Sequence, residues 1–103
     1  MTGMVPWTTA KSEELYGFPH WGAGYFHIND RGHVTVTPDG PQGPSVDLAE
    51  LVESARQRNI EMPLLFRFNG ILRHRVRAIG AAFQAAITEY DFQGKYCPIF
   101  PIK

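Results

Sequence analysis

Few residues of this sequence have types and spacings that point to chemistry, and most of those are basic. The densest group follows Leu72 and consists of Arg73, His74, Arg75 and Arg77. Such a cluster can bind phosphate or nucleic acid, but a solvated helix face gives the same pattern. We favour the solvated face. The formal net charge is zero, from 10 basic and 10 acidic residues, so no overall field attracts nucleic acid or an anionic membrane.

Metal and thiol chemistry have little support in the sequence. Four histidines share no spacing that would place two of them on one metal ion: His20, His27, His33 and His74. The single cysteine, Cys97, allows no disulfide within the chain and no zinc-type Cys/His pattern. We therefore expect no metal site and a location in the reducing cytoplasm. No stretch has the pattern of a signal peptide or the length needed to cross a membrane.

Arg67 is the most unusual charged residue, because it lies inside the apolar stretch 63–68, PLLFRF. A charge in a buried strand needs a partner. We predict that Arg67 pairs with Glu50 or Glu53. The alternative is that it points towards an active site.

The elements that must position these residues begin with a short helix within residues 7–16, for which Thr8 or Thr9 is the predicted N-cap. We expect Pro19 to end any such helix. A β-hairpin follows over residues 24–37. Its two strands would be joined by the turn 29–32, Asn-Asp-Arg-Gly, whose residues tolerate positive φ.

The second half of the sequence alternates between helical and strand patterns. After the loop 38–44, Asp47 and Glu50 form the pattern of a capping box, which predicts a helix to about Arg58 with Asn59 as its C-cap. Residues 63–68 are predicted as a strand. Asn69 is the predicted cap of a longer helix, whose apolar residues recur at steps of three and four: Leu72, Val76, Ile79, Phe83, Ala86, Ile87 and Tyr90.

Residues 95–102, KYCPIFPI, are predicted as a last strand, followed by Lys103. The order is then hairpin, helix, strand, helix, strand, and the last three elements form a right-handed parallel βαβ unit. Two parallel strands make a poor sheet by themselves. We therefore predict an α/β fold, or an α+β fragment, in which a hairpin precedes the opening βαβ portion of a barrel.

Three stretches together resemble the amino-terminal region of the biosynthetic arginine decarboxylases. They are WTTAKSEELYGFPHWGAGYFHINDRGHVTVTPDG, VDLAELVESARQRNIEMPLLFRFNGILRHRVRAIGAAF and the closing YCPIFPIK. The resemblance covers nearly all of the chain after about residue 6. This family consists of large pyridoxal-phosphate enzymes of fold type III, the class similar to alanine racemase.

The resemblance implies two domains: residues 1–45 would belong to the β-domain, and residues 46–103 would open the (β/α)8 barrel. Lys103 would match the lysine that binds pyridoxal phosphate, as both its catalytic and its cofactor-binding residue. A lysine at the carboxyl end of a barrel strand is where barrel enzymes keep catalytic groups. Magnesium would accompany the whole enzyme, although no ligand for it can be assigned here.

The whole enzyme would convert L-arginine to agmatine and carbon dioxide for polyamine synthesis, as a homo-oligomer. The sequence offers no Gly-rich phosphate loop before a helix, no acidic partner for the cofactor ring and no group to bind a guanidinium. We therefore expect this chain to be inactive alone. The alternatives are a non-catalytic binding module that docks on a decarboxylase chain, and an unrelated small α+β domain.

Overall fold

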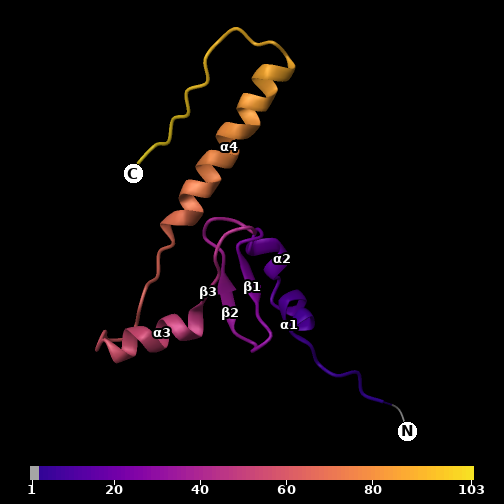
Figure 1. The fold of residues 1–103 in the computed structure, drawn as a ribbon, viewed down its shortest axis with the longest axis vertical. Coiled ribbons are helices and arrows are strands. Elements are labelled where there is room, and N and C mark those ends of the chain that lie inside the picture. The colour runs from indigo at the N-terminus through magenta and orange to yellow at the C-terminus, as the bar shows by residue number, and fades with distance from the viewer. Residues whose placement is uncertain (1–2) are drawn as a thin grey trace.

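The computed structural model describes residues 3–103 and contains four helices and a three-stranded antiparallel sheet in that range (Figure 1). The order is α1 (Thr9–Leu15), α2 (Phe18–Trp21), β1 (Phe26–Ile28), β2 (Val34–Val36), β3 (Val46–Asp47), α3 (Leu48–Gln57) and α4 (Asn69–Glu89). The fold is thus a mixture of helices and a small sheet, as the sequence predicts.

Two short helices precede the sheet. Thr8 is the N-cap of α1, because its hydroxyl accepts a hydrogen bond from the backbone N–H of Lys11 at 3.2 Å. This confirms the predicted cap. Pro19, however, does not end a helix: it lies in the first turn of α2, where a proline costs no hydrogen bond. Gly17, with a φ of 70°, separates the two helices. The first helix therefore ends before Gly17 rather than at Pro19.

The predicted hairpin is confirmed. β1 and β2 pair antiparallel, with His27 opposite Thr35. The turn closes through a 2.9 Å hydrogen bond from the Gly32 N–H to the Asn29 carbonyl, and Gly32 has a φ of 78°. This left-handed position explains the glycine. Val36 in β2 is fully buried and lies at the centre of a small core with Phe18, Tyr25 and Ala55.

β3 is a third strand, in a stretch where the sequence predicts only the start of a helix. Val46 pairs with Val36, and Asp47 pairs with Thr35, so β3 lies on the free edge of β2. The chain then passes directly from β3 into α3. As a result α3 packs against β2 and β3. The hairpin and the first long helix therefore share one core.

Both ends of α3 carry the predicted signals. Asp47 caps the first turn by accepting hydrogen bonds from the N–H groups of Ala49 and Glu50, at 2.9 and 3.2 Å. At the other end, Asn59 has a φ of 58°, and the Ile60 N–H donates to the Ala55 carbonyl at 3.0 Å. This is a Schellman motif with asparagine in the left-handed position.

The long helix α4 is confirmed, but its first turn differs from the prediction. The N-cap is Phe68, which makes no capping hydrogen bond, and Asn69 is the first helical residue rather than the cap. α4 shares no extensive contact with any other helix or strand. Its apolar residues are consequently exposed: Leu72 is 68% exposed and Phe83 is 53% exposed.

The predictions of strands at residues 63–68 and 95–102 are wrong for this structure. Both stretches are irregular, and Leu65, Ile99 and Ile102 are 78%, 83% and 97% exposed. A strand needs a hydrogen-bonding neighbour, and a parallel pair needs further strands and covering helices. The described residues offer neither, so no βαβ unit forms.

The molecule is elongated. Its radius of gyration is 19.2 Å, against about 13 Å for a compact domain of this size. Figure 1 shows the reason: α4 projects away from the sheet and the other helices, and the closing segment runs back beside it. The ring of Tyr96 in this segment stacks on Phe83 of α4 at 4.8 Å.

Candidate functional site

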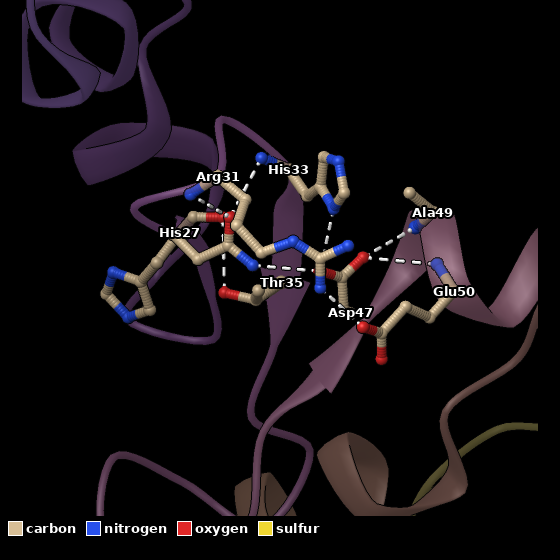
Figure 2. A network of polar contacts seen from close by, with 8 residues as sticks. His27, Arg31, His33, Thr35, Asp47, Ala49 and Glu50 are labelled. Carbon is tan, nitrogen blue, oxygen red and sulfur yellow. Dashed lines mark hydrogen bonds and ion pairs between the residues drawn. The ribbon is translucent and has the colours of Figure 1, made fainter.

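A network of polar side chains joins the hairpin turn to the start of α3 (Figure 2). At its centre is the Asp47 carboxylate, which accepts hydrogen bonds from His33 Nδ1 and Asn29 Nδ2, both at 2.8 Å. The Arg31 guanidinium lies 3.9 Å from the same carboxylate and forms an ion pair with Glu50. The residues come from the turn and from the first turn of α3, which β3 places side by side.

This network shows that the predicted capping box is only half formed. Asp47 caps α3 as expected, but the Glu50 side chain turns outward to Arg31 and does not return to the Asp47 N–H. Glu50 is also the residue expected to pair with Arg67. Arg67 is exposed and forms no ion pair with any residue in the range 3–103, so the predicted Arg67 pairing is wrong.

Asp47 is the group with the most perturbed acidity. Its side chain is only 10% exposed, and burial by itself would raise the carboxyl pKa. The hydrogen bonds from His33, from the Glu50 N–H and from Asn29 outweigh burial, and they lower the pKa from 3.8 to about 2. Arg31 is affected in the opposite direction. Its hydrogen bond to the Glu50 carboxylate raises the pKa of the guanidinium.

An aspartate bonded to a histidine can orient an imidazole as a general base. Here His33 is 31% exposed, and no hydroxyl or thiol among the described residues is bonded to its second ring nitrogen. Asp47 is also committed to the helix cap. The arrangement therefore fixes the hairpin turn against α3, and it does not form a nucleophile–histidine–aspartate triad with any described residue.

A second contact fixes α4 to the sheet. The Tyr25 hydroxyl and His74 Nδ1 are 2.6 Å apart, and their rings meet edge to face at 5.4 Å. Gly40 lies against the same imidazole, because a Cβ there would be 2.6 Å from His74 Nε2. The prediction of a solvated basic face is therefore wrong for His74. Arg73, Arg75 and Arg77 are exposed, as that prediction requires.

Neither contact can be predicted from the sequence, for the same reason in both cases. His33 and Asp47 are 14 residues apart, and Tyr25 and His74 are 49 apart. No local pattern pairs residues at such distances. The one available signal is the Val46-Asp47 pair before the α3 helix, since a valine before an N-cap is compatible with a short edge strand.

Lys103 lies in the irregular closing segment and is exposed. No hydrogen bond or ion pair joins it to another residue in the described range. The described residues thus form no pocket around its amine, and they do not fit pyridoxal phosphate by themselves. Within residues 3–103, no three histidine, cysteine, aspartate or glutamate side chains lie close enough to hold a metal ion.

An aromatic groove of about 700 Å³ lies between α1, α2 and the hairpin. Its lining contains no charged side chain and includes the following: Trp7, Thr8, Thr9, Ser12, Tyr16, Phe18, Trp21, Ile28, Gly32 and Val34. Two of its hydroxyls already accept hydrogen bonds: that of Thr8 from the Lys11 N–H, and that of Ser12 from Trp7 Nε1. The groove therefore has no charged side chain to pair with a phosphate or a guanidinium. None of the helices in the described part of the chain has the length and hydropathy of a membrane span.

Comparison with known proteins confirms the resemblance found in the sequence. The chain is 52% identical over 97 residues to the biosynthetic arginine decarboxylase of Thermosynechococcus vestitus. It is 48% identical, again over 97 residues, to the proteins of that name from Prochlorococcus marinus and Pseudomonas putida. These matches cover 94% of this chain. No family model matches the chain, and no solved structure matches it.

The matches cover this chain almost fully but cover only a small part of the relatives. The chain spans 15% of the length of each of the three proteins. It therefore corresponds to a piece of the relatives rather than to a whole one. The parts of the relatives that it does not match are roughly five times as long as the chain itself.

Proposed function

Because this chain matches a segment of biosynthetic arginine decarboxylases over 94% of its length, we propose that it is the amino-terminal part of such an enzyme. The whole enzyme would convert L-arginine to agmatine and carbon dioxide in the cytoplasm, for polyamine synthesis. One observation carries the proposal: identity of about one residue in two continues over 97 residues and includes the hairpin, both long helices and the stretches between them.

Two domains would meet within this chain. Residues 1–45 would belong to a β-domain, and residues 46–103 would open a (β/α)8 barrel. The exposure of the two apolar stretches supports this division. Leu65 in 63–68 and Ile99 in 95–102 are 78% and 83% exposed, which is unusual for branched aliphatic side chains unless another part of the protein covers them. The missing strands of a barrel would supply that cover.

Lys103 would be the residue that binds pyridoxal phosphate covalently, with magnesium present in the whole enzyme. Its place directly after an apolar, β-rich stretch supports this role, since barrel enzymes carry catalytic groups at the carboxyl ends of their strands. The chain alone would be inactive, because the described residues form no pocket that keeps water away from the amine. The pocket, the cofactor phosphate site and the substrate site would come from the rest of the enzyme, in a homo-oligomer.

A chimeric enzyme tests the proposal. The 97 matching residues of the Thermosynechococcus vestitus decarboxylase would be replaced by the aligned residues of this chain, and carbon dioxide release from L-arginine would be measured. We expect the chimera to be active. Lys103→Ala in the chimera should reduce the rate by on the order of 10³-fold or more, as removal of a covalent catalyst typically does.

Lys95→Ala provides the matched control, because Lys95 opens the same irregular segment and is also exposed. It should leave the rate within about twofold, as expected for a surface change. Borohydride treatment followed by peptide mass spectrometry should find the pyridoxyl group on Lys103. A folded chimera with pyridoxyl on another lysine would refute the role of Lys103, and a folded chimera without any activity would refute the proposed family function.

The exposed apolar surface of α4 favours a second candidate, a non-catalytic module that docks on a decarboxylase chain. The two candidates differ in one measurement. A docking module would co-purify with an intact decarboxylase that already contains its own copy of this segment. A structural piece of the enzyme would not co-purify, because the intact enzyme's own segment fills the same place.

A further inference from the structure

Asn69 is followed directly by Gly70 at the start of α4. This is the only Asn-Gly pair in the chain, whose other asparagines are Asn29 and Asn59. Asn-Gly is the pair in which asparagine most readily loses its side-chain amide, because glycine has no side chain to shield the backbone nitrogen that attacks. Position 69 therefore carries a chemistry that neither the polar network nor the proposed function uses.

The contacts of the described residues leave both reacting groups of this pair unengaged. The Asn69 side chain is exposed and forms no hydrogen bond with any residue in the range 3–103. The Gly70 N–H also has no acceptor among those residues, because it lies in the first turn of α4, where backbone N–H groups have no partner within the helix. The N-cap, Phe68, adds no side-chain hydrogen bond to that turn.

We propose that Asn69 is a site of spontaneous deamidation, and that opening of the uncapped first turn of α4 sets its rate. In a helical backbone the Gly70 nitrogen does not face the side-chain carbon that it must attack, so the turn must open before the two atoms can react. A first turn without a cap opens more readily than a capped one. This inference goes beyond the proposed function and does not depend on any decarboxylase activity.

The reaction has two steps and needs only water as a co-reactant. The Gly70 backbone nitrogen bonds to Asn69 Cγ while the Cγ–Nδ2 bond breaks, and the proton of that nitrogen leaves with the amide group as ammonia. The five-membered succinimide that results then takes up one water molecule. Opening at one carbonyl gives aspartate, and opening at the other gives isoaspartate, in which the main chain runs through Cβ. Either product adds one negative charge.

The other two asparagines are protected by their surroundings. Asn29 donates its amide to Asp47 at 2.8 Å, and its side-chain oxygen accepts two backbone N–H groups of the same turn at 3.0 and 2.9 Å. Asn59 precedes Ile60, whose N–H already donates to a carbonyl of α3 at 3.0 Å and whose branched side chain shields that nitrogen. The same chain therefore contains two internal controls for Asn69.

Isoaspartate at position 69 would disturb the contact of α4 with the loop 38–44. Gly70 is crowded there, because a Cβ at this position would lie 2.8 Å from Asp39 Oδ1 and 2.9 Å from Pro38 Cβ. Isoaspartate inserts one carbon into the main chain directly before this point and so displaces Gly70. Aspartate keeps the main chain at its length and places its charge at a helix N-terminus, where a carboxylate is favourable. Only the isoaspartyl form should therefore loosen α4.

Peptide mass spectrometry of the folded 103-residue chain tests the site, after incubation at mildly alkaline pH. We expect deamidation at Asn69 to be at least about tenfold faster than at Asn29 or Asn59, since those two react only after a larger part of the fold opens. Chromatography separates the aspartyl and isoaspartyl peptides. Asn69→Gln should abolish the reaction, because its longer side chain does not close the five-membered ring.

Phe68→Ser tests the role of the missing cap. The new hydroxyl can accept the N–H of Gly70 or Ile71, and it should slow deamidation about fivefold relative to Phe68→Ala. Phe68→Ala is the matched control, because it removes the same ring and adds no acceptor. Circular dichroism would show that both variants keep α4.

Hydrogen exchange compares the two products. The isoaspartyl chain, isolated by chromatography, should exchange at least about tenfold faster than the unreacted chain at residues 73–77. Asn69→Asp carries the same added charge on a main chain of normal length. Its exchange at these residues should stay within about threefold of the unreacted chain.

Three results would overturn the inference. Equal deamidation rates at Asn69 and Asn59 in the folded chain would refute the site. Equal rates in Phe68→Ser and Phe68→Ala would show that opening of the first turn does not set the rate. An isoaspartyl chain with unchanged exchange would refute the loosening of α4. None of these results bears on the chimeric enzyme, whose activity is measured separately.

Discussion

Asp47 joins two parts of the molecule, the hairpin turn and the start of α3, through one carboxylate. One oxygen accepts the backbone N–H groups that begin α3, and the other accepts His33 and Asn29 from the hairpin turn. All of these groups favour the charged carboxylate. Loss of that charge would therefore weaken the cap and the turn together.

This carboxylate predicts how stability depends on pH. Because the pKa of Asp47 falls from 3.8 to about 2 in the folded chain, its stabilising effect is complete above about pH 4. The effect should be lost as the pH falls from 4 towards 2. Urea unfolding at pH 5 and pH 2.5 would measure it, and Asp47→Asn should remove most of the difference between the two pH values.

Asp30→Asn is the matched control for this experiment. Asp30 lies in the same turn, is exposed, and forms no hydrogen bond through its side chain with the described residues. Its replacement should leave the loss of stability in acid unchanged. Equal pH dependence in the wild type and in Asp47→Asn would show that other carboxylates govern stability in acid.

At the scale of elements, α4 meets the sheet side of the molecule near its first turns. One of the contacts there is formed by Tyr25, His74 and Gly40, and Gly40 has a φ of 96°. Position 40 therefore favours glycine for two reasons. Its backbone is left-handed, and a Cβ there would collide with His74 Nε2. Gly24 has a similar φ of 83° but has open space around it.

The two glycines make a comparison possible. Gly24→Ala and Gly40→Ala should each lose about 1 kcal/mol of folding free energy, from the cost of a left-handed alanine. Only Gly40→Ala should also displace His74. Hydrogen exchange would detect this displacement as faster exchange in the first turns of α4, at residues 73–77. Equal exchange in both variants would contradict the proposed attachment.

The sequence predicts the elements whose causes are local. The hairpin turn depends on Asn29 and Gly32, and the ends of α3 depend on Asp47 and Asn59, so each signal lies within a few residues of its effect. β3 was missed because a two-residue strand depends on its neighbour β2. The strands expected at 63–68 and 95–102 are absent because nothing in the described range pairs with them.

The candidate site, too, depends on contacts that signals within a few residues do not reveal. The role expected for Lys103 follows from resemblance alone, since the residues that would surround it are not in the described range. Arg67 was expected to pair with Glu50 or Glu53, because a charge inside a buried strand needs a partner. In the structure Glu50 forms an ion pair with Arg31, because the hairpin turn places Arg31 beside the first turn of α3. Partner choice among charges depends on tertiary distances that no spacing rule provides.

At the scale of the whole molecule, two regions differ in how much contact supports them. The sheet, α1, α2 and α3 share one core, whereas the stretch 61–68 and the closing segment are irregular and largely exposed. Limited trypsin digestion should reveal this difference. We expect the first cuts at Arg67 and Lys95, at least about tenfold faster than cuts at the arginines inside α4, since proteolysis follows local opening.

Mass spectrometry of the early fragments would check this order. The fragment that ends at Arg67 should persist and keep its strand signal in circular dichroism. First cuts at Arg31 would contradict the prediction, because they would show that the turn opens more readily than the linker, despite its ion pair with Glu50.

The stacking of Tyr96 on Phe83 has a practical consequence. The next residue, Cys97, is exposed and carries the only thiol of the chain. A fluorescent maleimide would therefore attach at one position without any mutation, beside the ring that touches α4. Its emission would change when the closing segment leaves the helix, so the natural sequence already provides a reporter for the part of the molecule that holds Lys103.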